Sequence, residues 1–180
     1  MLGLLTCGAC LVTKDVDFSV DNSPPAVIGA VGDLKPEKLA RVPEVSDPKC
    51  PVVADAIFMR FEAKIVDIDV DQTLQARLLV NGNPVGQGQR QIGPAPMNAR
   101  ERNFQPFCIN ADDLRSPCNL VELIVSSAFD PLAASDPYAT VLPDDLGHYE
   151  WWVIGSAASQ ADVRPADCFA TVQPRDGGIP

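Results

Sequence analysis

The sequence predicts an all-β fold, an antiparallel immunoglobulin-like β-sandwich preceded by an extended Pro-rich segment. Apolar and polar residues alternate with period two in several segments, which is typical of strands with one face in water. These segments are short, and prolines interrupt the connections between them. No long amphipathic helix is evident, and 180 residues suffice for one domain with a core.

The first clear strand is expected from Ala54 to Ile65. Arg60, Glu62 and Lys64 share one face of this segment. The opposite face carries apolar side chains, namely those of Ile57, Met59, Phe61, Ala63 and Ile65. One face should therefore lie in the core and the other in water.

A hairpin follows in "TLQARLLVNGNPVGQGQRQ". Leu74, Leu78 and Val80 alternate with polar residues, and Asn81-Gly82 supplies the positive φ angles of a tight turn. Val85 should begin the returning strand.

Three later segments complete the predicted strands: "NFQPFCI", "NLVELIVSS" and "HYEWWVIG". The block "ADDLRSPCNLVELIVSSAF", followed by "HYEWWVI", resembles the last elements of immunoglobulin-like or fibronectin type III-like domains. The likeness covers residues 54–155 and is one of pattern, because the Cys-Trp-Cys core spacing of antibody domains is missing. The resemblance implies a β-sandwich and no particular function.

Residues 11–50 are expected to form a linker with at most an edge strand, and residues 51–180 the sandwich domain. The segment carries six prolines, a density that interrupts both helices and ladders. Counted with Pro51, which lies just after the segment, the six are Pro24, Pro25, Pro36, Pro43, Pro48 and Pro51, so five lie within residues 11–50. The alternative is a loop packed along the domain.

Two cysteines three positions apart, in "LLTCGACLV", admit three interpretations. A redox dithiol needs a preceding strand and an activating helix, and neither is evident around Cys7 and Cys10. A structural zinc site needs a second pair of ligands, whereas the other cysteines are dispersed. The third interpretation is a lipid attachment point at the end of an export signal.

The neighbours of Cys10 favour this third interpretation. Met1 to Ala9 is uncharged and apolar, and small residues precede Cys10. "TCGAC" resembles a bacterial lipobox, although the position usually held by Leu is Cys7 and no basic region precedes it. The resemblance implies a palmitate-bearing surface lipoprotein whose signal, at residues 1–10, is either degenerate or truncated; in the second case the true start lies upstream of Met1. A plain apolar N-terminus is the alternative.

This lipobox-like signal predicts a lipid-anchored protein of the bacterial cell envelope, at the outer membrane on its periplasmic or surface side. Removal of Cys7 and lipidation of Cys10 leave four cysteines for two disulfides. The most local pairing is Cys108 with Cys118 and Cys50 with Cys168, one of three possible pairings. No segment reaches the 18 apolar residues of a membrane span.

The net charge of −10 argues against nucleic acid and anionic lipid surfaces as partners. Catalytic constellations are scarce as well. His148 is the sole histidine, no Gly-x-Ser-x-Gly motif accompanies it, and no pair of carboxylates stands out. We therefore expect a protein that is not an enzyme. His148 is expected to be a surface residue or a packing residue and not a catalytic one.

Calcium is the one cofactor with a candidate motif. Asp67, Asp69 and Asp71 alternate in "DIDVDQ", as at the start of an EF-hand loop. The sixth position is Gln72 where such a loop needs Gly, and the twelfth is Leu78 where it needs Glu. A solvated strand end is the favoured interpretation, with no cofactor.

Two functions remain. The first is a non-catalytic structural or protein-interaction role, in which a sheet edge or face docks to an envelope or surface-appendage protein. The assembly formed in this way could be oligomeric. The second is a carbohydrate- or small-ligand-binding module that uses the "YEWW" segment. On a strand, Tyr149 and Trp151 share one face and Trp152 the other. One face should be core, and the other would offer a single ring.

Overall fold

The fold is all-β, as predicted. The computed structural model describes residues 23–32, 34, 39–85, 88–96, 99–102, 106–155 and 168. Within them the elements are β-strands and one short 3-10 helix, η1 (Ala111–Asp113). No described helix is long and apolar enough to cross a membrane.

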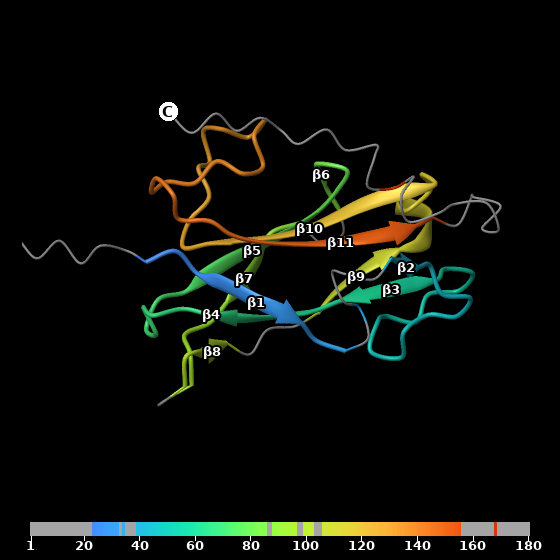
Figure 1. Ribbon diagram of the computed structural model, residues 1–180, viewed down its shortest axis with the longest axis horizontal. Coiled ribbons are helices and arrows are strands. Elements are labelled where there is room, and N and C mark those ends of the chain that lie inside the picture. The colour runs from blue at the N-terminus through green and yellow to red at the C-terminus, as the bar shows by residue number, and fades with distance from the viewer. Residues whose placement is uncertain are drawn as a thin grey trace, which may run out of the picture.

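The largest sheet has the strand order β2-β11-β10-β5-β6, and β7 also pairs with β5. The bounds of its strands are β2 Ala40–Arg41, β5 Leu74–Val80, β6 Asn83–Pro84, β7 Arg90–Ile92, β10 Cys118–Ser126 and β11 Gly147–Ile154. The long neighbours β10 and β11 are antiparallel over their whole length, whereas β2 runs parallel to β11. This sheet forms one layer of the molecule (Figure 1).

Two smaller antiparallel sheets face it. One has the order β1-β4-β8, with bounds Ala26–Ala30, Ala63–Val66 and Glu101–Arg102. The other pairs β3 (Phe58–Phe61) with β9 (Phe107–Asn110). Figure 1 shows β1, β3, β4 and β8 below the layer of β10 and β11.

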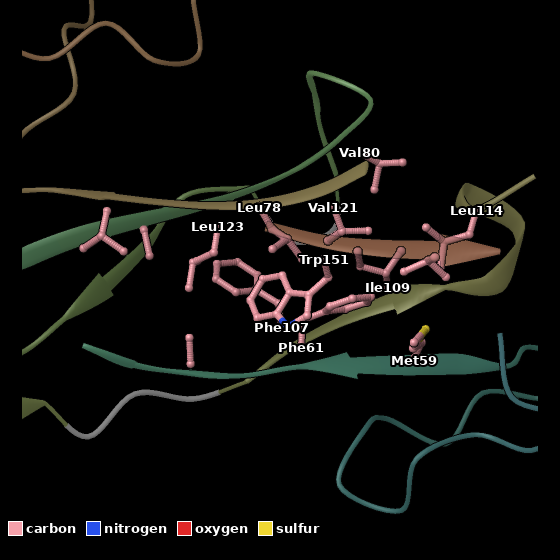
Figure 2. Close-up of a cluster of buried hydrophobic side chains, with 14 of the residues drawn as sticks. Met59, Phe61, Leu78, Val80, Phe107, Ile109, Leu114, Val121, Leu123 and Trp151 are labelled. Atoms are coloured by element: carbon pink, nitrogen blue, oxygen red, sulfur yellow. The ribbon is translucent and has the colours of Figure 1, made fainter. Parts of the chain in front are cut away.

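The core fills the space between the layers (Figure 2). Its centre is Trp151 of β11, which meets the ring of Phe61 edge-on at a centroid distance of 5.4 Å. Aromatic side chains bury large apolar areas, and such edge contacts add stability beyond the burial itself. Phe107, Leu78 and Val121 pack in the same cluster.

The predicted strand at residues 54–65 is two strands that share one buried face. Met59, Phe61, Ala63 and Ile65 are each 4% exposed or less, so the predicted alternation is confirmed. The chain changes partner between them: β3 pairs with β9, and β4 pairs with β1 and β8. Glu62, between the strands, accepts a hydrogen bond from the backbone of Val31.

The predicted turn after β5 is confirmed. Asn81 and Gly82 have φ angles of 52° and 78°, the left-handed region that such a turn requires. The Asn81 side chain also accepts a hydrogen bond from the backbone N–H of Leu120, at 2.9 Å. The turn is thereby joined to β10.

The Pro-rich segment belongs to the domain over its described part, which corrects the expectation of a linker up to residue 50. The strand β1 pairs with β4 and β2 pairs with β11, while Val42 and Cys50 are buried. Contact is close at Gly147, where a Cβ atom would lie 2.3 Å from the carbonyl oxygen of Pro25. The prolines lie outside β1 and β2, so they do not interrupt the ladders. Residues 11–22 lie outside the described residues.

All four predicted disulfide cysteines are paired, but the predicted pairing is wrong. The bridges are Cys50–Cys108 and Cys118–Cys168, with Cα–Cα distances of 5.7 and 5.2 Å. Cys108 lies on β9 and Cys118 on β10, strands of different sheets, so nearness in sequence does not bring these two thiols together. The segment before β3 folds back on β3, where the backbone N–H of Asp47 donates to the carbonyl oxygen of Phe58. Because β3 pairs with β9, this places Cys50 beside Cys108.

Candidate functional site

The candidate site lies on the outer face of the large sheet, the face that points away from the core. Successive side chains of a strand point to opposite faces. On β11, His148 and Glu150 are exposed while Trp151 and Val153 are buried in the core. Glu122 of β10 is the register partner of Glu150. We call Glu122, His148 and Glu150 the outer cluster.

A loop formed by residues 127–146 covers part of this outer face, and we call it the covering loop. Its Phe129, Tyr138 and Leu146 pack on Leu79 and Ile124 in a second apolar cluster. The guanidinium of Arg77 lies 3.9 Å from the centroid of the Phe129 ring. The covering loop therefore gives the outer face its own small apolar layer, beside which the outer cluster lies.

Asp145, which is 1% exposed, holds the base of the covering loop in place. Its carboxylate accepts hydrogen bonds from the Ser126 hydroxyl at 2.9 Å and from the backbone N–H of Ser127 at 2.8 Å. Hydrogen bonds to a carboxylate are stronger than those between neutral groups. The two ends of the loop are thus joined next to the start of β11.

The three side chains of the outer cluster converge on one point. Nε2 of His148 lies 3.2 Å from Oε1 of Glu122 and 3.6 Å from Oε1 of Glu150. One ligand atom from each residue lies within 4.8 Å of the other two. The hydroxyl of Tyr138 lies 2.8 Å from both carboxylate oxygens of Glu122 and donates its single proton to that carboxylate.

Burial and charge are unequal within the outer cluster. Glu122 is 6% exposed, whereas the side chains of His148 and Glu150 are 38% and 46% exposed. The hydrogen bond to Glu122 raises the pKa of His148, and the charges of Glu150 and Glu122 raise it further, while partial burial acts against them. The geometry can hold a positive charge, either a proton on the imidazole or a cation among the three side chains.

The sequence did not reveal this cluster. His148 stood out as the sole histidine, but its partners depend on the register of β10 against β11 and on where the covering loop lies. One signal was present: Glu122 interrupts the apolar run "LVELIV", where a charge needs a partner if it is buried.

The predicted ligand residues Tyr149, Trp151 and Trp152 divide between the two faces, as their alternation predicts. Trp151 is 1% exposed and donates from Nε1 to the carbonyl oxygen of Leu34 at 3.3 Å. Tyr149 packs on Trp151 and accepts a hydrogen bond from the backbone N–H of Ala30. Trp152 alone lies on the outer face, partly buried.

The carboxylates of the three aspartates of "DIDVDQ" have different partners. Asp67 is buried in an ion pair with Arg102, Asp69 accepts a hydrogen bond from the backbone of Ser23, and Asp71 is exposed. The outer cluster, and not these aspartates, is the group of potential ligands that comes together in the described part of the chain. Cys10, the predicted lipidation site, lies outside the described residues, as does Cys7.

Comparison with protein-family models, with curated proteins and with solved structures yields no match for this chain.

Proposed function

We propose that this protein is a non-catalytic domain of the bacterial cell envelope, anchored by a lipid on Cys10, with a structural or protein-interaction role. The observation that carries the proposal is the pair of disulfides, Cys50–Cys108 and Cys118–Cys168. Structural disulfides persist in oxidising compartments such as the periplasm and the cell surface, and are rare in the cytosol.

The arrangement of strands supports an immunoglobulin-like sandwich as the scaffold of this role. The order β11-β10-β5-β6 resembles the G-F-C-C′ sheet of such domains, and β1 with β4 resembles the A and B strands of the facing sheet. Domains of this architecture serve many functions, so the scaffold supports the proposal without specifying a partner.

The strand β1 is the candidate docking edge for an envelope or appendage protein. It ends the order β1-β4-β8, and its sequence AVIGA contains no charge or proline to discourage pairing. Ile28 is 56% exposed at an irregular step in the register with β4. An extended segment of a partner would add to this edge by backbone hydrogen bonds.

The test begins with the lipid. Mass analysis of the protein from its native membrane should give an N-terminus at Cys10, an acyl mass increment and no free thiol. Cys10→Ser should release a folded protein into the soluble fraction. A mature chain that retains both Cys7 and Cys10 as thiols would refute the anchor.

The interaction role is tested by crosslinking in native membranes. Ile28→Lys should abolish a crosslinked partner that the wild type captures, because a charge on an edge strand opposes pairing. Leu132→Lys is the matched control, since Leu132 is 93% exposed and lies on the covering loop, outside the β1-β4-β8 sheet. Equal capture by both variants would exclude β1 as the docking edge.

The second candidate function, binding of a carbohydrate or small ligand, is favoured by the position of Trp152 on the outer face. Aromatic rings are common contacts for apolar ligand faces. Addition of oligosaccharides should then quench or shift the emission of Trp152 in a Trp151→Phe variant. Unchanged emission across a panel of oligosaccharides would remove this candidate.

A further inference from the structure

We propose that the outer cluster, Glu122, His148 and Glu150, is a binding site for one divalent transition-metal ion, of which Zn²⁺ is the best fit. The proposal concerns a site that is independent of the lipid anchor and of the β1 edge.

Two of the three distances between ligand atoms in the outer cluster match a metal site, and all three atoms lie within 4.8 Å of one another. Ligand bonds of about 2.0–2.2 Å to a tetrahedral Zn²⁺ place neighbouring ligand atoms about 3.3–3.6 Å apart. Nε2 of His148 lies 3.2 and 3.6 Å from one oxygen of Glu122 and one of Glu150. The same nitrogen faces both carboxylates, so one ion would contact all three side chains.

The backbone holds these ligands rigidly. Glu122 and Glu150 are opposite one another in the ladder of β10 and β11, and His148 lies two residues before Glu150 on the same face. Both strands carry core residues on their other face, among them Leu123 and Trp151. Sites built on packed strands keep their ligands in place better than sites built on loops.

Electrostatics favour a cation here. Like charges directly opposite on neighbouring strands destabilise a sheet. Glu122 and Glu150 are such a pair, and Glu122 is almost fully buried. Two carboxylates and a neutral imidazole carry a charge of −2, which a divalent ion neutralises.

Tyr138 supplies the outer support that metal ligands usually have. Its hydroxyl donates to the Glu122 carboxylate, and its ring packs in the apolar cluster of the covering loop. Such second partners orient a ligand, and their removal lowers metal affinity about 10–100-fold.

The donor set selects the class of metal. An imidazole nitrogen with carboxylate oxygens suits Zn²⁺ and its neighbours, whereas Ca²⁺ and Mg²⁺ prefer oxygen ligands alone. Because His148 and Glu150 are partly exposed, water would complete the coordination of the ion.

The test is a titration of the untagged full chain with ZnCl2, in a Cys7→Ser/Cys10→Ser background, because the unprocessed chain retains these two cysteines and their thiols would compete for the metal. Calorimetry should show one Zn²⁺ per chain. The imidazole NMR signals, which are unambiguous because the chain has one histidine, should shift in step with binding.

Three variants and one control make the test specific. His148→Gln and Glu150→Gln should each weaken Zn²⁺ binding at least about 10-fold, and Tyr138→Phe by about 10–100-fold. Glu101→Gln, a change of an exposed carboxylate on β8, should bind as the parent does. Near-ultraviolet circular dichroism confirms that each variant is folded.

Two results would overturn the proposal. One is the absence of Zn²⁺ binding at concentrations up to about 1 mM, which corresponds to a binding free energy of only about −4 kcal/mol. The other is equal binding by the parent, His148→Gln and Glu150→Gln, since the metal would then be held elsewhere.

Discussion

Asp67 and Arg102 form an ion pair in which neither side chain has exposed surface, with 2.5 Å between Nη2 and Oδ2. The guanidinium also donates to the backbone carbonyls of Asp69 and Gly93, at 2.6 and 3.0 Å. The positive partner of Asp67, the first carboxylate of "DIDVDQ", is thus Arg102. Through these contacts Arg102, on β8, holds the connection between β4 and β5. A planar guanidinium suits this role because it presents several donors in fixed directions.

Replacement of Arg102 by Met should lower the free energy of unfolding by about 3–5 kcal/mol, because Asp67 is left as a buried charge without its partner. Lys64→Met is the control, since the pair of Lys64 with Glu101 is exposed and contributes no more than about 1 kcal/mol. Urea unfolding of both variants measures the difference. Similar small losses in the two would show that the buried pair does not stabilise the fold.

Removal of either disulfide as a pair of Cys→Ser changes should destabilise the protein by about 4 kcal/mol, because bridges that span 58 and 50 positions restrict the unfolded chain strongly. Peptide mapping without reduction should recover Cys50 with Cys108, and Cys118 with Cys168. A peptide that joins Cys108 to Cys118 would contradict the placement of β9 and β10 in different sheets.

The two tryptophans should differ in their access to solvent. In Trp152→Phe the remaining indole, Trp151, is 1% exposed, so its emission should be blue-shifted and resist quenching by acrylamide. In Trp151→Phe the remaining ring lies on the outer face, and its quenching constant should be larger. The second variant also loses core packing and should unfold at a lower urea concentration. Equal quenching constants would contradict the orientation of β11.

His148 should titrate above the ordinary pKa of about 6.5 in metal-free protein, because Glu122 and Glu150 favour its charged form. A raised pKa in the folded state stabilises the fold fully below the unfolded pKa, and this contribution is lost as the pH rises through the folded pKa. The stability of wild type relative to His148→Gln should therefore fall as the pH rises above about 6.5 and through the raised pKa of the folded state. NMR of the single imidazole in the presence of EDTA gives the pKa directly. Glu122→Gln should lower it; an unchanged pKa in that variant would refute the pairing.

The alternation of residues was enough to predict the core face of β3, β4, β5 and β11. Ile65, Leu74 and Trp151 all lie inside, since period two is a local property of an extended chain. The pairing of β1 with β4 and of β2 with β11 was missed, because the proline density of residues 11–50 suggested a linker with at most an edge strand. The prolines lie outside these two strands, and the number of prolines in a segment does not show where they fall relative to its strands.

Contacts between residues far apart in sequence could not be predicted from local patterns. Nearest-neighbour pairing of cysteines failed because Cys108 and Cys118 lie on strands of different sheets. The outer cluster likewise depends on the register that places Glu122 opposite Glu150, a relation between strands. Tyr138 reaches Glu122 only because the covering loop folds back over the sheet. Each of these contacts requires knowledge of the assembled layers.

The two bridges also limit how far the protein can be stretched. A force that pulls the two ends of the chain apart passes through the disulfides, so the 58 and 50 positions that they span add no length, although each would otherwise contribute about 3.5 Å. The parallel contact of β2 with β11, two residue pairs long, and the pairing of β1 with β4 would give way first. Between residues 23 and 168 the domain would then lengthen by the part before Cys50 and by residues 109–117, while the two bridged segments would bear load through their disulfides.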